Sequence, residues 1–181
     1  EGDMNQPIRD SYRARVRWLV ANLGTALVAS VIIYNFGGAI DEMWTLAVLM
    51  PIVASIGGNA GTQTMAVAVR ALGMNQLKRS NTWRGVWREI RLPLLNGLTI
   101  AILIGAGVAF VFRDVQLGAV IAAAMLINIA VAGLAGVLVP LLLERFDQDP
   151  AVASSVFVTM ITDSMGFFAF LGLAVASGLV G

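Results

Sequence analysis

The chain has 181 residues, of which 58% are hydrophobic and 13% charged, with a formal net charge of +1 and a mean hydropathy of +0.82. Soluble domains carry about 25% charged residues, so this composition excludes an ordinary soluble surface and indicates one membrane-embedded domain. The absence of cysteine excludes disulfides and thiolate metal sites, and the absence of histidine removes the commonest ligand of zinc and copper.

The first fifteen residues are polar, with arginines close to the first apolar run. For residues 1–15 we predict either a cytoplasmic tail or the remnant of a helix that connects to an upstream domain. The first residue is Glu1 rather than methionine, so we expect the chain to be part of a longer protein. Residues 16–181 are predicted to form a transmembrane domain.

Five apolar runs follow, each long enough for a membrane crossing of about 20 residues. We predict transmembrane helices over about residues 16–36, 43–72, 92–112, 115–143 and 150–179. The expected fold is therefore an all-α polytopic membrane protein with five transmembrane helices and a basic loop between the second and third.

The basic residues are distributed unevenly between the two ends of these helices. If the N-terminus is inside, eleven of the twelve Lys and Arg residues fall in inner segments, and only Arg113 falls outside. The positive-inside rule then predicts a cytoplasmic N-terminus and an external C-terminus in the cell (inner) membrane. Because an odd number of helices cannot form two equal inverted halves, a pathway would be enclosed more simply by symmetry between identical chains.

One acidic residue, Asp163, lies deep within a predicted membrane helix. A charge there costs about 2.5–3.5 kcal/mol on insertion scales, so it is seldom left without a polar partner, water or an ion. Ser155, Thr159 and Asp163 are spaced by four and form one polar line along the helix, with Thr162 beside it. We predict a cation-binding carboxylate that faces a water-filled path; the alternative is a protonated Asp bonded to a neighbouring helix.

The second predicted site is the glycine-rich segment 51–63. Pro51 removes a helical hydrogen bond, and the glycines allow either close approach of another backbone or local unwinding. Unwound backbone at membrane depth is tolerated where it lines a cavity, and its carbonyls can bind ions. Asn59 and Gln63 would present their amides on one side, whereas helix packing alone is the alternative explanation. For Asn128, midway along the fourth helix, we predict an interhelical hydrogen bond, with a role in the pathway as the alternative.

Two motifs in this order resemble the MgtE family of magnesium channels and transporters. The first is Pro51-Ile-Val-Ala-Ser-Ile-Gly-Gly-Asn-Ala-Gly-Thr-Gln63, and the second is Thr159-Met-Ile-Thr-Asp163 followed by Gly166-Phe-Phe. The resemblance implies a homodimer with a cation pathway along the dimer interface, lined by the second and fifth helices, in which Asp163 matches the pore aspartate. The family's cytoplasmic N-terminal and paired regulatory (CBS) domains are missing from this sequence; either the parent protein has them or this member lacks them.

The predicted site offers oxygen ligands only, which suits Mg²⁺, Ca²⁺ or Mn²⁺ better than zinc or copper. The resemblance selects Mg²⁺, with Mn²⁺, Co²⁺ and Ca²⁺ as alternatives. The predicted metal contacts are Asp163, Thr159, Ser155 and Asn59. The predicted pore-lining residues are Gly57, Gly58, Gly61, Thr62, Gln63 and Thr162.

The main functional hypothesis is a passive Mg²⁺ channel with a largely hydrated ion in a dimeric pore. The alternatives are a cation-coupled Mg²⁺ exchanger and a non-transporting membrane assembly subunit. No enzyme activity is expected, since an intramembrane aspartyl hydrolase would need two cooperating carboxylates. One chain has a single deep acid, so a dimer would have to supply the pair. The expected partners are a second copy of the chain, membrane lipid and the divalent cation, and no nucleic acid is expected.

Overall fold

The structure is a computed structural model that describes residues 7–74 and 82–181. Over these residues the chain forms six helices and no strand. They are α1 (Ile8–Asn35), α2 (Gly37–Glu42), α3 (Thr45–Gly73), α4 (Thr82–Val111), α5 (Val115–Arg145) and α6 (Pro150–Ala176). Five of these helices are long and apolar enough to cross a membrane, which confirms the all-α prediction with five candidate spans.

Two helices begin earlier than their apolar runs suggest. α1 starts at Ile8 rather than at residue 16, and α4 starts at Thr82 rather than at residue 92. Hydropathy detects only the part of a helix that crosses the membrane, whereas arginine and glutamate are good helix formers and extend the helix beyond it. The prediction of a loop up to residue 91 was therefore wrong. Lys78 and Arg79, two of its basic residues, lie outside the described ranges.

The glycine-rich segment does not unwind. α3 is continuous from Thr45 to Gly73, with Pro51 inside it. Gly57 and Gly61 are buried, so these glycines face other helices rather than a break in the backbone. Of the two uses of glycine that the sequence allowed, close approach of a neighbour is the one that α3 adopts.

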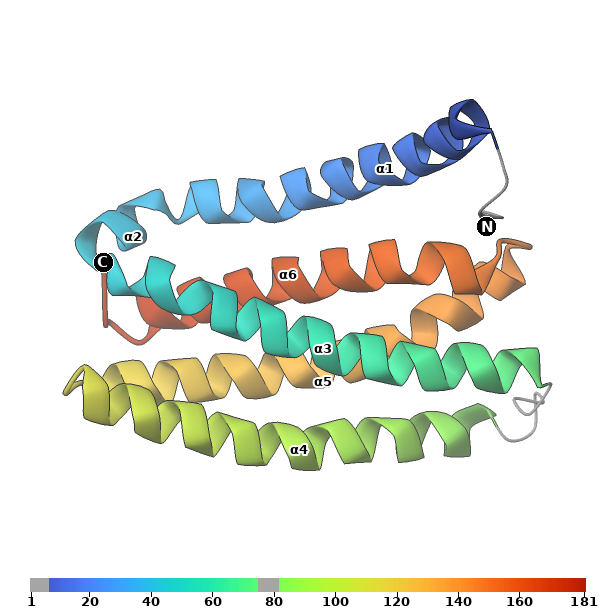
Figure 1. Cartoon of the computed structure of the whole chain (residues 1–181). Helices are drawn as coiled ribbons and strands as arrows, with labels where there is room; N and C mark the ends of the chain where they lie inside the picture. The colour runs from blue at the N-terminus through green and yellow to red at the C-terminus, as the bar shows by residue number, and fades with distance from the viewer. Residues whose placement is uncertain (1–6, 75–81) are drawn as a thin grey trace.

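α5 is the central helix of the bundle. It packs against α3, α4 and α6, and α3 also packs against α6. α1 lies on the other side of α6 and is connected to α3 through the short α2 (Figure 1). Since α5 has neighbours on three sides, buried residues occur all around it, whereas α1 buries only Ala29.

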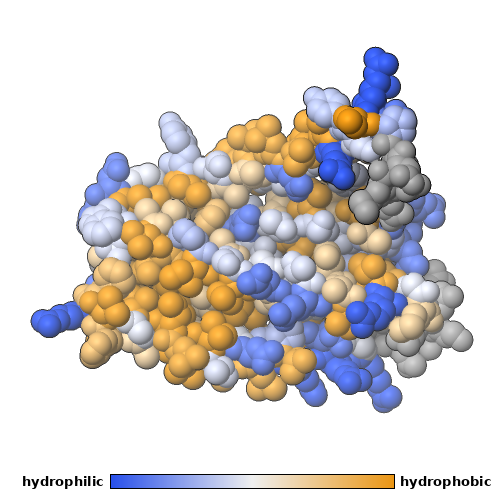
Figure 2. All heavy atoms as spheres, in the orientation of Figure 1, coloured by the Kyte–Doolittle hydropathy of each residue, from blue (hydrophilic) through white to orange (hydrophobic). Residues whose placement is uncertain are grey.

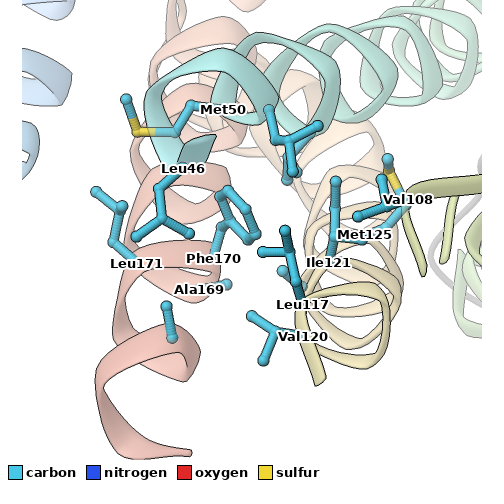
Figure 3. Close-up of a cluster of buried hydrophobic side chains, with 14 of the residues drawn as sticks. Leu46, Met50, Val108, Leu117, Val120, Ile121, Met125, Ala169, Phe170 and Leu171 are labelled. Carbon is cyan, nitrogen blue, oxygen red and sulfur yellow. The ribbon is translucent and has the colours of Figure 1, made fainter. Parts of the chain in front are cut away.

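The largest apolar cluster joins α3, α5 and α6 near one end of the bundle. Leu46, Ile121 and Phe170, one from each helix, are fully buried, and their side chains point toward one another in Figure 3. Burial of side chains of this size contributes about 1.5–3 kcal/mol each in a water-based reference. In lipid the main stabilising contribution is close packing between the helices.

α4 and α5 approach closely at a pair of glycines. A Cβ atom added to Gly118 would lie 2.5 Å from the carbonyl oxygen of Gly105 and 2.9 Å from the Cβ of Ala109. Small residues at such a crossing allow two backbones to touch, which is a common source of stability between membrane helices. Gly107, by contrast, has no atom within 4 Å of an added Cβ.

The helices alternate in direction. In Figure 1, α1 begins at the right, where α3 and α5 end, and α6 ends at the left. Aspartates cap two helices: Asp114 Oδ1 accepts from the Leu117 N–H at 3.0 Å, and Asp149 Oδ1 accepts from the Ala151 N–H at 3.0 Å. If each of the five long helices crosses the membrane once, the start of α1 and the end of α6 lie on opposite sides of it. The cytoplasmic position of the N-terminus stays a prediction.

The Gly105–Gly118 crossing leads to a stability prediction. We expect Gly118→Val to lower the free energy of unfolding by about 1–3 kcal/mol, because the added atoms overlap backbone that cannot move independently. Gly107→Val is the matched control and should leave thermal stability in detergent nearly unchanged. Equal melting temperatures for the two variants would show that α4 and α5 do not cross at these glycines.

Candidate cation site on α3 and α6

Asp163 lies near the middle of α6 and is half-buried. Across residues 7–74 and 82–181, no donor is hydrogen-bonded to its carboxylate and no Lys or Arg pairs with it. No group of three or more Asp and Glu side chains in these ranges could hold a metal ion. Within one chain, Asp163 is thus a single carboxylate without a bonded neighbour, which argues against a bond to an adjacent helix.

The polar line of α6 faces away from the bundle. Ser155 and Thr159 are exposed on the same side as Asp163. An apolar environment would penalise three polar side chains in a row, so such a face needs water, an ion or a polar partner. The three residues that the spacing placed on one side of the helix thus lie on the outer side of α6 in the structure.

Thr162 belongs to a different face of α6. It is fully buried, and its hydroxyl donates to the Thr159 carbonyl at 3.1 Å. A Cβ added to Gly61 would lie 3.3 Å from Thr162 Cγ2, and one added to Gly58 would lie 3.9 Å from Thr162 Oγ1. The structure therefore brings Thr162 against the glycines of α3, where α3 and α6 pack.

The residues of the α3 motif divide between packing and exposed positions. Gly57 and Gly61 are buried and Gly58 is half-buried, whereas Asn59, Thr62 and Gln63 are exposed. The glycines thus match the packing explanation and the polar residues remain free to meet water or another molecule. Figure 2 shows hydrophilic and weakly polar residues across the middle of this face, over α3, with hydrophobic residues on both sides.

Asn59 and Gln63 line a groove of about 430 Å³ between α3 and α4. Asn96 and Glu89 of α4 and Ile129 of α5 also line this groove. None of the described lining residues belongs to α6, so within one chain Asn59 does not share a cavity with Asp163. Asn96 was not among the site residues predicted from the sequence, although an amide within an apolar run was a usable signal.

Asn128 holds α5 against α3 beside this site. It is fully buried, and its Nδ2 donates to the Val53 carbonyl at 3.0 Å, which confirms the predicted interhelical hydrogen bond. Its Oδ1 is buried and has no partner in the described part of the chain. A Cβ at Gly57 would overlap the Asn128 amide, and one at Gly166 would lie 2.8 Å from Nδ2.

The glycines on either side of Asn128 therefore make room for its amide between α3 and α6. Gly166 is three residues beyond Asp163, less than one helical turn away. The amide thus sets the separation of α3 and α6 next to the carboxylate.

Comparison with known proteins identifies one family. The MgtE family model, described as a divalent cation transporter, matches residues 50–173. This range contains both the α3 motif and Asp163.

Three relatives, each named magnesium transporter MgtE, align with most of the chain. The Enterococcus faecalis protein is 37% identical over 164 residues, which is 88% of this chain and 35% of that protein. The Bacillus subtilis protein is 30% identical over 167 residues (92% and 37%), and the Thermus thermophilus protein is 33% identical over 162 residues (89% and 36%). The chain spans about a third of the length of these relatives.

The position of the Asn128 amide predicts different outcomes for two adjacent glycines. Gly57→Ala places a methyl group on the amide and should destabilise the protein by about 1–3 kcal/mol. Gly58→Ala meets only the Thr162 hydroxyl at 3.9 Å and should be tolerated. Thermal unfolding of both variants in the same detergent measures the difference.

A double variant tests whether Asn128 is the cause. In the Asn128→Ala background, Gly57→Ala should cost less, with a coupling energy of about 0.5–3 kcal/mol. An unchanged cost in that background would assign the effect of Gly57→Ala to another neighbour.

Proposed function

The chain belongs to the MgtE family of divalent cation transporters, and we propose that it forms the membrane pathway of a Mg²⁺ channel with Asp163 as the central ion-binding group. The observation that supports this most directly is Asp163 itself, a carboxylate at mid-helix on a polar face of α6, without a hydrogen-bond partner among residues 7–74 and 82–181. The family match spans that residue. The protein is a multi-pass membrane protein, which fits the cell membrane.

The pathway is proposed to lie between two copies of the chain. One chain supplies a single carboxylate at this level, and a two-fold axis would supply a second, so that two negative charges face one divalent cation. Closed two-fold symmetry is the commonest arrangement of identical subunits. Ser155 and Thr159 are exposed on a single chain and would face the axis together with Asp163.

The cation is proposed to pass largely hydrated. Mg²⁺ gives up its water reluctantly and is usually held by one or two carboxylates with several waters retained. The hydroxyls of Ser155 and Thr159 can accept or donate hydrogen bonds to such waters. Asn59 lines the α3–α4 groove and shares no described cavity with Asp163 of its own chain, so its amide oxygen would meet the hydrated cation at another level of the proposed path.

The remaining pore residues are proposed to act in two ways. Thr62 and Gln63 are exposed and would contact the hydrated path directly. Gly57, Gly58, Gly61 and Thr162 would shape the pathway indirectly, because they lie in the packing of α3 against α5 and α6 and affect how close α6 comes. The width of the path at Asp163 would thus depend on this packing.

A passive pathway of this kind is driven by the membrane potential. Each elementary charge gains about 2.3 kcal/mol per 100 mV, so a divalent cation gains about twice that on entering a negative interior. No counter-ion is then required. A Mg²⁺ exchanger would instead need a gradient of the second cation.

Magnesium flux into liposomes tests the role of Asp163. Under an imposed potential, Asp163→Ala and Asp163→Asn should each lower Mg²⁺ flux by about tenfold or more, the loss expected for at least 1.4 kcal/mol of ion stabilisation. Asp41→Asn, which removes an exposed acid in α2, is the control and should retain flux. Normal transport by both Asp163 variants would overturn the proposal, and flux that requires a counter-ion gradient would favour an exchanger.

Two adjacent serines test the polar face of α6. Ser155→Ala should lower Mg²⁺ flux by about two- to tenfold, since one hydrogen bond contributes about 0.5–1.5 kcal/mol. Ser154→Ala is the matched control, because Ser154 is fully buried inside the bundle and should not reach the ion. A larger effect of Ser154→Ala on flux at equal stability would place the path on a different face.

A further inference from the structure

The first turns of α4 place three arginines on one helix face. Arg84, Arg88 and Arg91 are spaced by four and three, which is the spacing of neighbours on a helical surface. All three are exposed. Hydropathy predicted a loop for these residues, which gives them no common orientation, whereas the helix aligns them on one side.

An apolar surface continues directly from these arginines. Trp87, Leu92 and Leu95 are 55%, 61% and 66% exposed. Further along α4, Ile102 and Leu103 are also exposed, at 61% and 64%. The outer side of α4 thus changes from cationic to apolar within about two turns. In Figure 2, hydrophilic residues protrude at the lower right, near the start of α4, and hydrophobic residues gather at the lower left.

The arginines and the apolar side chains border the same hollow. Its described lining residues, all from α4, are Arg84, Trp87, Arg88, Glu89, Arg91, Leu92 and Leu95. Glu89 is half-buried and also lines the groove toward α3, so it lies at the margin of the arginine face. Among described residues no salt bridge neutralises the three guanidinium groups, which leaves this hollow with a positive excess.

We infer that this face of α4 binds an anionic phospholipid. The guanidinium groups would hold the phosphate, because Arg offers planar paired donors that match phosphate oxygens. The acyl chains would lie along Leu92 and Leu95 toward the apolar part of α4. Trp87 suits the headgroup level, where aromatic side chains with one polar edge concentrate. This lipid site lies on α4, which carries none of the residues proposed to contact the ion, and it meets the α3–α4 groove at Glu89 and Leu92.

A soluble partner domain fits this surface less well. A protein surface that meets the arginines from the aqueous side would leave Leu92 and Leu95 uncovered. A phospholipid carries a charged headgroup followed by apolar chains, just as this face of α4 carries arginines followed by leucines. This correspondence is the reason for assigning lipid as the occupant.

The positive-inside rule alone requires basic residues near the membrane but no particular arrangement. α1 provides a matched comparison, since Arg9, Arg13 and Arg17 are also exposed and spaced by four. Removing either set changes the charge equally. A site built on α4 should respond only to the loss of the α4 arginines.

Lipid-dependent thermal stability of the purified protein tests the inference. The protein in neutral detergent is titrated with phosphatidylglycerol or with phosphatidylcholine, and the melting temperature is recorded. We expect phosphatidylglycerol to raise the melting temperature of wild type and of the Arg9→Gln/Arg13→Gln/Arg17→Gln variant. The Arg84→Gln/Arg88→Gln/Arg91→Gln variant should lose at least half of this increase. Phosphatidylcholine should change the melting temperatures of all three proteins by the same amount.

Further arms make each outcome decisive. Leu92→Ser/Leu95→Ser keeps the charges and should also weaken the effect of phosphatidylglycerol, since both side chains are exposed and the change should not disturb the core. Inorganic phosphate alone should give little stabilisation. Equal losses in the α1 and α4 arginine variants, or full stabilisation by inorganic phosphate, would overturn the inference in favour of unspecific charge attraction. If the α4 variant is too unstable to measure, native mass spectrometry of retained lipid on Arg88→Lys and Arg88→Gln should show fewer bound lipids for Gln.

Discussion

The arrangement of this protein depends on one buried amide. Asn128 reaches from the central helix α5 to the Val53 carbonyl of α3, and its side chain fits only because residues 57 and 166 are glycines. A buried amide without a hydrogen bond is costly in an apolar bundle. The arrangement therefore needs both the bond to Val53 and the space that the two glycines leave for the side chain. Gly166 is three residues beyond Asp163 in α6, so this contact between α3, α5 and α6 lies within one helical turn of the carboxylate.

Polar residues divide between the packed and the outer faces of α3 and α6. α3 and α6 turn their glycines, Thr162 and Val158 toward the bundle, while Ser155 and Thr159 of α6 and Asn59 and Gln63 of α3 remain outside. A soluble protein could leave such groups in water, but a membrane helix must place them against water, ions or polar partners. The polar side of α6 is therefore the surface on which a second copy and a hydrated cation are proposed to meet.

The outer faces of α1 and α4 carry the apolar side chains expected to meet lipid. α1 packs only on α6 apart from its short connection to α2, and most of its apolar side chains face outward, as expected for a helix with lipid on several sides. α4 exposes a cationic start and an apolar continuation on one side. These surfaces are independent of the contacts around Asn128, so changes to them can alter membrane placement without moving Asp163.

The number, type and approximate extent of the membrane helices were determined by the sequence alone, because a long apolar run in lipid can satisfy its backbone only as a helix. The polar line on α6 was also predictable, since positions four apart share one helix face. The start of α4 was not predictable from hydropathy, because helix formation continues past the apolar run into residues that favour helix without entering the membrane. The tertiary structure alone decided that Gly57 and Gly61 pack rather than unwind, and that Asn59 lies with Asn96 and not with Asp163, because these outcomes depend on which helix comes to lie against each face.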